Sequence, residues 1–391
     1  MNKWIKGTQL EPCVLVIDDG SVFPGKSFGY PPPSVSDLSE TRTPKMPAGE
    51  VVFNTGMAGY HEILTDPSYS GQIIVMTYPH IGNYGTDEAW TEYGPGTDEQ
   101  WSRLKARALV VRSLYDGPIP AGRESLDSFL KRYKTSGITG VDTRNLTLKI
   151  RNGGNPIGVI VKSRTSAALG RAEKLACLDY LRSCPVMEGR DLVSGLGTRD
   201  TLCLNESGSP HISLVDCGVK AGIIRDLTAH GCKVSLVPNG IQADDLLALR
   251  PDAILFSNGP GDPAVLKHLI GLVRELIGRK PVFGICLGHQ LISLALGCDT
   301  FKMKFGHHGV NNPVRDEESG SVLITSQNHG FSVDESSLPS DCSIWFRNVN
   351  DRTIEGIAHS RLPILTTQFH PEAAPGPRDS QWIFKRFLER I

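Results

Sequence analysis

Pro-Val-Phe-Gly-Ile-Cys-Leu-Gly-His-Gln-Leu, residues 281–291, predicts a buried strand, a sharp turn and the start of a helix. The helical pattern ends at Gly297, since a glycine commonly follows a helix. Cys286 stands at the corner, and Gly284 and Gly288 remove side chains that would otherwise collide there. This is the thiol counterpart of the Gly-x-Ser-x-Gly elbow, and a helix N-terminus favours a thiolate. A lone cysteine is more often a structural residue, but the two glycines favour a nucleophile.

Composition places the chain among globular proteins without a strong charge bias. It has 391 residues, of which 39% are hydrophobic and 21% charged, and this length predicts two or three domains. The net charge of -1 gives no reason to expect a polyanion-binding surface. We expect no signal peptide and no membrane span. The nine cysteines include no Cys-x-x-Cys pair, which favours a reducing cytoplasm over a disulfide framework or a zinc site.

The first half predicts an α+β domain over residues 1–186, and the polar stretch 187–210 predicts a linker. Within the first domain, Gly20–Ser27 matches the phosphate-binding P-loop pattern. The following residues, which include three consecutive prolines, cannot begin the helix that a P-loop requires. We therefore interpret the match as chance on a β-hairpin, and residues 24–48 as an exposed loop.

Residues 211–391 alternate strands with helices, which predicts a doubly wound, mostly parallel sheet. The active crevice of such a sheet lies at the carboxyl ends of the strands. Cys286 and the loop 257–261 both fall at such ends. Beyond Thr300 we expect short strands at an antiparallel edge.

The remaining catalytic groups are predicted near the C-terminus. A strand over 363–369 ends in His370-Pro371-Glu372. In an extended segment, residues two apart point to the same side. Glu372 is therefore expected to orient His370, which would act as the base for Cys286. The backbone N–H of Leu287 is expected to stabilise the oxyanion, with that of Gly259 as the second donor, although Gly259 is equally typical of an ordinary turn.

Two pairs of adjacent residues that contain histidine have simpler interpretations. His61 and Glu62 are adjacent, so they do not share a face, and we expect a structural or solvated role. His307 and His308 have no acidic or sulfur partner at ligand spacing, so a polar loop is favoured over a metal site.

Three of these motifs together resemble a class I (triad) glutamine amidotransferase. Further strings are similar to the small, glutamine-hydrolysing subunit of carbamoyl-phosphate synthetase, and the similarity covers nearly the whole chain. The strings for the class are Phe283–Gln290, Ser257–Asp262 and His370–Glu372, and those for the subunit are Asn54–Gly85, Lys302–His308 and Gln327–Phe331.

The resemblance implies that Cys286 forms a γ-glutamyl thioester with glutamine, while His370 and Glu372 complete the triad. It implies a partner-facing role for residues 1–186. It also implies that ammonia passes to a large subunit, which uses ATP and bicarbonate to make carbamoyl phosphate for pyrimidines and arginine. We expect no cofactor and no metal in this chain. By matching positions, the glutamine contacts would be Ser68, Gly259, Gly261, Leu287, Gln290, Asn328, Gly330 and Phe331.

Two departures and two alternatives accompany this interpretation. Gly222 stands where the family string usually carries asparagine, and the loop 24–48 is longer than usual; either could alter docking or ammonia transfer. A stand-alone glutaminase, or an amidotransferase serving another acceptor, would need only residues 211–391. A catalytically silent scaffold would not need the intact triad.

Overall fold

The structure is a computed structural model that describes residues 10–39, 47–95, 104–164 and 169–391. The chain forms two compact units. The first comprises residues 1–64, 71–90 and 100–186, and the second comprises residues 65–70, 91–99 and 187–391. Two short segments of the N-terminal half therefore belong to the second unit.

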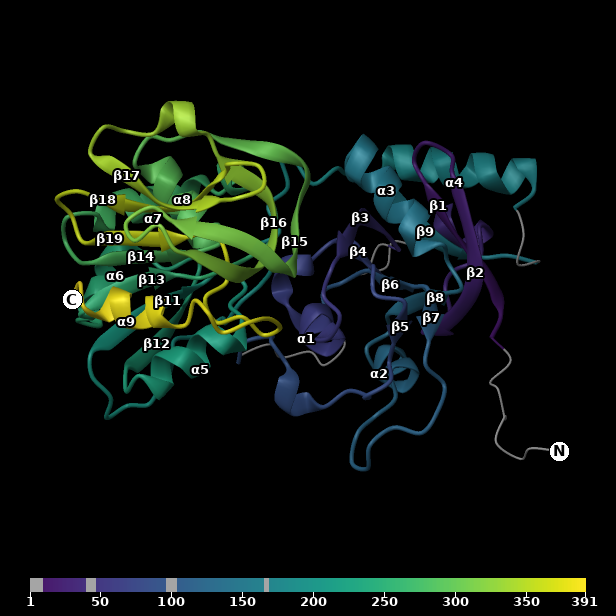
Figure 1. Ribbon diagram of the computed structural model, residues 1–391, viewed down its shortest axis with the longest axis horizontal. Helices are drawn as coiled ribbons and strands as arrows, with labels where there is room; N and C mark the ends of the chain where they lie inside the picture. Colours follow the sequence, from purple (N-terminus) through teal and green to yellow (C-terminus); the bar gives the residue numbers. More distant parts are fainter. Residues whose placement is uncertain (1–9, 40–46, 96–103, 165–168) are drawn as a thin grey trace. The chain divides into compact units, whose positions relative to one another are not determined.

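The first unit is built on a closed barrel with buried apolar strands (Figure 1). Its strands follow one another around the barrel in the order β1, β2, β8, β6, β4, β3, β9. Outside the barrel, β5 (His80–Ile81) pairs with β7 (Ser113–Leu114). The bounds of the barrel strands are β1 Pro12–Ile17, β2 Val22–Gly29, β3 Ala48–Asn54, β4 Gln72–Met76, β6 Ala108–Val111, β8 Ser136–Thr139 and β9 Ile157–Lys162.

The P-loop-like sequence lies in a hairpin, as expected. β1 and β2 pair antiparallel, with Leu15 opposite Phe23, and strand β2 rather than a helix occupies residues 22–29. The expectation of a loop from residue 24 is wrong, because β2 continues to Gly29 and pairs with β8. Residues 40–46 of that expected loop lie outside the described residues. Burial alternates along the first half of β2, where Phe23 and Gly25 are buried and Pro24 and Lys26 are exposed, and packing in the barrel overrides the turn signals of its proline and glycines.

Short helices complete the first unit. They are α1 Tyr60–Thr65, whose last residue falls in the second unit, α2 Leu126–Arg132, α3 Thr143–Gly153 and α4 Arg171–Ser183. The sequence predicts helices over residues 126–134, 143–151 and 167–182, close to the last three, but it does not predict α1. It buries Tyr60, Ile63 and Leu64. A six-residue helix depends on such burial, because isolated helices of this length are unstable.

The second unit is organised by one mixed sheet (Figure 1). Its strand order is β10, β12, β11, β13, β14, β19, β18, β17, β15, β16, and the run from β12 to β19 is parallel. The predicted α/β class is confirmed. The bounds are β10 Leu202–Leu204, β11 His211–Asp216, β12 Lys233–Pro238, β13 Ala253–Phe256, β14 Val282–Ile285, β15 Thr300–Asp316, β16 Val322–Val333, β17 Cys342–Asn348, β18 Ile354–His359 and β19 Ile364–Thr367.

Helices cover both faces of the parallel strands, as a doubly wound sheet requires. α5 (Ala221–Ala229) and α9 (Trp382–Leu388) bury apolar side chains against one face. α6 (Ala243–Ala248), α7 (Lys267–Leu276) and α8 (Leu287–Ala295) do so on the other. This arrangement leaves the carboxyl ends of the strands open for a site.

The antiparallel part differs from the expectation of short strands. β15 has 17 residues and β16 has 12, and they form a long ribbon with two register shifts. Its bulges interrupt the regular alternation of polar and apolar residues that would have predicted long strands. Within the expected linker, β10 pairs antiparallel with β12.

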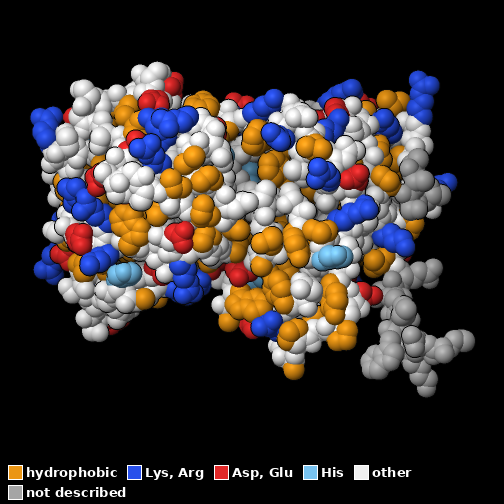
Figure 2. Space-filling model, in the orientation of Figure 1, with side chains coloured by type: hydrophobic (Ala, Val, Ile, Leu, Met, Phe, Trp, Pro, Cys, Tyr) orange, Lys and Arg blue, Asp and Glu red, His pale blue; other side chains and the backbone are white. Residues whose placement is uncertain are grey.

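Charged side chains of both signs are interspersed on the face shown in Figure 2, in keeping with a net charge of -1. Among the described residues, no helix is long and apolar enough to cross a membrane.

Candidate active site

Cys286 occupies the turn between β14 and α8. Its backbone is strained, with φ 55° and ψ -103°, and its N–H donates to the Thr367 carbonyl oxygen at 2.7 Å. The neighbouring glycines permit this turn. A Cβ at Gly284 would lie 2.5 Å from the Gly288 carbonyl carbon, and a Cβ at Gly288 would lie 2.1 Å from the Phe256 carbonyl oxygen. The elbow predicted from the sequence is therefore present, with the cysteine at its apex.

His370 and Glu372 follow β19, beside the strand that carries Cys286. The His370 N–H donates to the Ser326 carbonyl oxygen at 2.9 Å, which fixes the backbone. Its ring Nδ1 lies 2.6 Å from Glu372 Oε1, so the carboxylate holds a proton on Nδ1. Nε2 is buried and has no hydrogen-bonding partner of standard geometry among the described residues. This leaves Nε2 as the nitrogen available to a neighbouring thiol.

The electrostatics of the site favour a charged histidine. Burial disfavours the charged imidazolium, but the attraction of the Glu372 carboxylate is stronger than this penalty. Together with a contribution from the nearby Cys286 sulfur, it raises the pKa of His370 to about 10. Burial likewise opposes the charged form of Glu372, but the Lys220 ammonium and His370 lower the pKa of Glu372 to about 2. Both side chains are essentially inaccessible to water. The histidine is therefore steadied as an imidazolium, which is the partner that a thiolate needs.

Lys220 adds a second cation to the same carboxylate. Its Nζ lies 3.2 Å from Glu372 Oε1 and also donates to the Ala373 carbonyl oxygen. Although burial opposes the ammonium, Glu372 outweighs it and the pKa of Lys220 is raised. Glu372 Oε1 thus interacts with two cationic side chains, those of Lys220 and His370.

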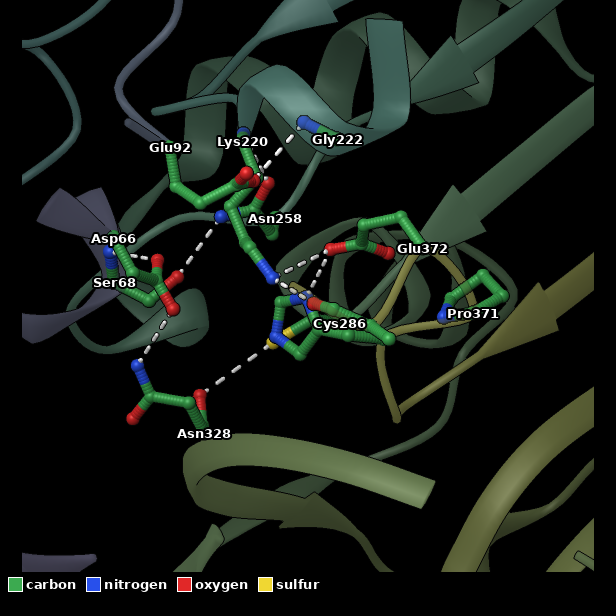
Figure 3. Close-up of polar contacts among 12 residues, drawn as sticks. Asp66, Ser68, Glu92, Lys220, Gly222, Asn258, Cys286, Asn328, Pro371 and Glu372 are labelled. Carbon is green, nitrogen blue, oxygen red and sulfur yellow. Dashed lines mark hydrogen bonds and ion pairs between the residues drawn. The ribbon is translucent and has the colours of Figure 1, made fainter. Parts of the chain in front are cut away.

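A hydrogen-bonded network extends from the elbow to residues 65–70 (Figure 3). The Cys286 thiol donates to the Asn328 carbonyl oxygen at 3.8 Å, and Asn328 Nδ2 donates to Asp66 Oδ2 at 3.2 Å. Asn258 Nδ2 donates to Ser68 Oγ at 2.9 Å, and Asn258 Oδ1 accepts the Lys220 N–H. The structure therefore brings Ser68 and Asn328 to the same neighbourhood as the cysteine.

The two predicted oxyanion donors are neighbours. A Cβ at Gly259 would lie 2.3 Å from the Cys217 carbonyl oxygen and 2.7 Å from Leu287 Cδ2, so only glycine fits there. Leu287 is the first residue of α8. The close approach explains the Gly-Pro-Gly loop, which sequence analysis could not distinguish from a plain turn.

The other predicted glutamine contacts are distributed more widely. Gln290 Nε2 donates to the Phe331 carbonyl oxygen and to Gln368 Oε1, so this amide connects α8 with β16. Gly330 and Phe331 lie beside Lys302, whose Nζ is 5.0 Å from the Phe331 ring centre. Gly261 has φ +93°, and a Cβ there would lie 2.9 Å from the Arg190 carbonyl oxygen.

One interpretation of a histidine pair needs correction. His307 and His308 are buried on β15 rather than in a polar loop. His307 also has acidic partners, Asp351 at 2.8 Å and Glu355 at 3.3 Å, which come from distant parts of the chain. Sequence spacing could not show these partners. His61, in contrast, is buried with its ring centre 4.7 Å from that of Phe129, in agreement with a structural role.

Lys220, Asn258 and Asp66 join the site although sequence analysis did not select them. Lys220 carried a signal, because it lies between apolar residues where a strand ends and a helix begins. Asp66 also carried a signal, because an aspartate before a proline is typical of an N-cap. It caps the short 3-10 helix Pro67–Tyr69, and its carboxylate accepts the Ser68 N–H.

The elbow, the sheet and the residues around them belong to a class I glutamine amidotransferase. The family model described as "Glutamine amidotransferase class-I" matches residues 213–390, and "Carbamoyl-phosphate synthase small chain, CPSase domain" matches residues 15–160.

Full-length relatives narrow the class further. The carbamoyl phosphate synthase small chain of Chlorobaculum tepidum is 43% identical over 385 residues, which is 97% of each chain. That of Methanopyrus kandleri is 43% identical over 378 residues, covering 96% of this chain and 98% of the relative. The chain therefore belongs to the carbamoyl phosphate synthase small-chain family, a glutamine amidotransferase that supplies ammonia for carbamoyl phosphate synthesis.

Proposed function

We propose that Cys286, His370 and Glu372 release ammonia from L-glutamine in this chain. The observation that carries the proposal is the combination of a strained elbow cysteine with a buried histidine held at 2.6 Å by a carboxylate. A nucleophile, a base and an orienting group in this order match the requirements of amide cleavage by a thiol.

In the first step, the Cys286 sulfur attacks the side-chain amide carbon of glutamine, and the thiol proton resides on His370 Nε2. The oxygen of the tetrahedral intermediate accepts hydrogen bonds from the N–H groups of Leu287 and Gly259. Loss of one such donor typically removes about 3 kcal/mol of transition-state stabilisation. The C–N bond then breaks, His370 protonates the departing nitrogen, and ammonia is released. A γ-glutamyl thioester remains on Cys286.

In the second step, His370 takes a proton from water, whose oxygen attacks the thioester carbon. The C–S bond breaks, the sulfur recovers its proton and glutamate is released. Glutamine and water are thus converted into glutamate and ammonia. The remaining predicted contacts, Ser68, Gly261, Gln290, Asn328, Gly330 and Phe331, would bind the rest of the substrate.

Ammonia would then pass to a large synthetase subunit, which carries the ATP and bicarbonate sites. The names of the full-length relatives imply this partner, since a small chain requires a large one. The product would serve pyrimidine and arginine synthesis. A reducing cytoplasm suits nine free cysteines, and residues 1–186 are proposed to face the partner.

The test uses Cys286→Ser in the complex with the large subunit. Because only glutamine hydrolysis needs the thiol, glutamine-dependent synthesis should fall by at least about 1000-fold, while synthesis from added ammonia continues. Mass spectrometry of the wild-type protein during turnover should detect a γ-glutamyl adduct on Cys286. Loss of both activities would make the residue structural, and unchanged glutamine-dependent activity would point to a silent scaffold.

A further inference from the structure

Glu92 is a buried carboxylate that the triad mechanism does not use. It belongs to the segment 91–95, which is part of the second unit. Its side chain is fully buried, accepts the Gly222 N–H at 3.0 Å and forms an ion pair with Arg225. Its backbone oxygen accepts the Ala221 N–H at 2.9 Å. The contacts hold Glu92 at the N-terminus of α5, immediately beside Lys220.

Lys220 connects this carboxylate to the triad. Its side chain runs from the start of α5 past Glu92 to Glu372 (Figure 3). Charge interactions with both Glu372 and Glu92 favour the buried ammonium, although burial opposes it. At the far end, Lys220 Nζ and His370 Nδ1 share one oxygen, Glu372 Oε1, at 3.2 and 2.6 Å. The two cations compete for this oxygen. By partly neutralising the charge of Lys220, Glu92 therefore affects how strongly Glu372 interacts with His370.

We propose that Glu92 is a positioning residue for the Cys286–His370–Glu372 triad and acts through Lys220. Burial raises the pKa of Glu92 to about 7, although Lys220 and Arg225 favour its carboxylate form. Above that pH Glu92 is ionised, the ammonium is balanced from two sides, and Glu372 keeps its short hydrogen bond to His370. Without the negative charge of Glu92, Lys220 attracts Glu372 Oε1 more strongly, and Glu372 stabilises the His370 imidazolium less. The inference rests on the proposed function, because it concerns the same three residues.

A purely structural role for Glu92 is the competing explanation. Lys220, the N-cap of α5, provides no side-chain cap, and Glu92 supplies that hydrogen bond instead. Losing a cap destabilises a helix by a small amount but leaves the titration of His370 alone. The two roles therefore differ in their effect on a pH profile.

Several charged groups face this chain of contacts and set the background for any pH effect. Glu92 is faced by Lys220 and Arg225. Lys220 is faced by Glu372 and Asp66 as well as Glu92. His370 is faced by Glu372, Lys220 and Cys286, and Asp226 interacts with Glu372.

The experiment compares wild type with Glu92→Gln in the complex with the large subunit. The first measurement is the rate of alkylation of Cys286 by iodoacetamide against pH. It needs no glutamine, so it remains informative even if the proposed function is wrong. We expect the titration of His370 in this profile to move down by about one pH unit, because the imidazolium is less stabilised. The second measurement is glutamine hydrolysis, whose kcat should fall about tenfold.

Asp216→Asn is the matched control, since Asp216 is also a buried carboxylate that accepts backbone N–H groups, from Gly218, Val219 and Thr198. It should lower thermal stability without moving the titration. Lys220→Met then closes a double-mutant cycle. If Glu92 acts through Lys220, adding Glu92→Gln to Lys220→Met should cause no further shift. An unmoved titration in Glu92→Gln, or fully additive effects in the double variant, would overturn the proposal.

Discussion

Position 222 shows how one atom constrains the site. A glycine inside a helix weakens it by about 1 kcal/mol relative to alanine, so its presence within α5 needs a reason. The structure gives a reason for it, because a Cβ at Gly222 would lie 2.9 Å from Glu372 Cγ and 3.0 Å from Glu92 Oε2. The glycine thus lets two carboxylates approach the start of the helix, one of them in the triad.

We predict that Gly222→Ala lowers glutamine hydrolysis about tenfold, although alanine favours a helix by about 1 kcal/mol. The added methyl group must displace the stem of Glu372, which His370 and Lys220 hold in place. Steady-state glutaminase assays of the complex, together with thermal unfolding, measure both effects.

Gly271→Ala is the comparison, because Gly271 lies within α7 and a Cβ there meets nothing within 4 Å. This variant should gain a few tenths to about 1 kcal/mol of stability and keep full activity. Unchanged activity in Gly222→Ala would show that Glu372 has more room than the contacts imply.

At the scale of elements, the elbow depends on the fit between α8 and the strands β13 and β14. The Gly288 N–H donates to the Ser257 carbonyl oxygen at 3.1 Å, and its Cα lies against the backbone of Phe256. The helix can approach the sheet this closely only without a side chain at 288. This contact fixes the start of α8 and therefore the position of Cys286.

Gly288→Ala should therefore destabilise the second unit by about 3 kcal/mol, at the upper end of ordinary overpacking, because the neighbour is backbone and cannot rotate away. Chemical denaturation followed by tryptophan fluorescence includes the signal of buried Trp345, which lies in this unit. Gly271→Ala again provides the reference for an alanine that fits. A change below about 1 kcal/mol would mean that α8 shifts freely on the sheet.

The same scale shows where element prediction succeeds and fails. The short apolar run Ala253–Phe256, between turn signals, predicts a strand, and β13 has these bounds. The sequence missed α1 and shortened β15 and β16. α1 is too short to show helical periodicity, and bulges break the alternation in the long ribbon. Local patterns carry no trace of contacts made by distant residues.

At the scale of the whole molecule, segments from the N-terminal half are part of the unit that holds the triad. Residues 65–70 contribute Asp66 and Ser68, and residues 91–95 contribute Glu92. The two segments are joined by the Glu92 N–H, which donates to Thr65 Oγ1 at 3.0 Å within the protein interior. Chain order alone would assign all of them to the first domain.

We predict that Thr65→Val loosens the segment 91–95, because it leaves the buried Glu92 N–H without this acceptor, at a cost of about 1–3 kcal/mol. The Ala221 and Gly222 amides, which donate to Glu92, should then exchange with solvent at least about tenfold faster. Hydrogen–deuterium exchange of peptides covering residues 219–227 measures this rate. Thr65→Ser retains the hydroxyl and should match wild type; equal exchange in all three proteins would mean that other contacts hold the segment.

The sequence by itself determined the class of fold, the elbow around Cys286 and the pairing of His370 with Glu372. These features depend on near neighbours: glycines on both sides of a turn, apolar runs of strand length, and two residues spaced to point the same way. Tertiary structure alone decided that Glu92, Asp66 and Lys220 surround the triad and that Glu372 Oε1 is shared between two cations. The contacts of Glu92 with Gly222, of Asp66 with Asn328 and of Lys220 with Glu372 join residues more than a hundred positions apart. Their energies come from burial and charge that no local pattern encodes.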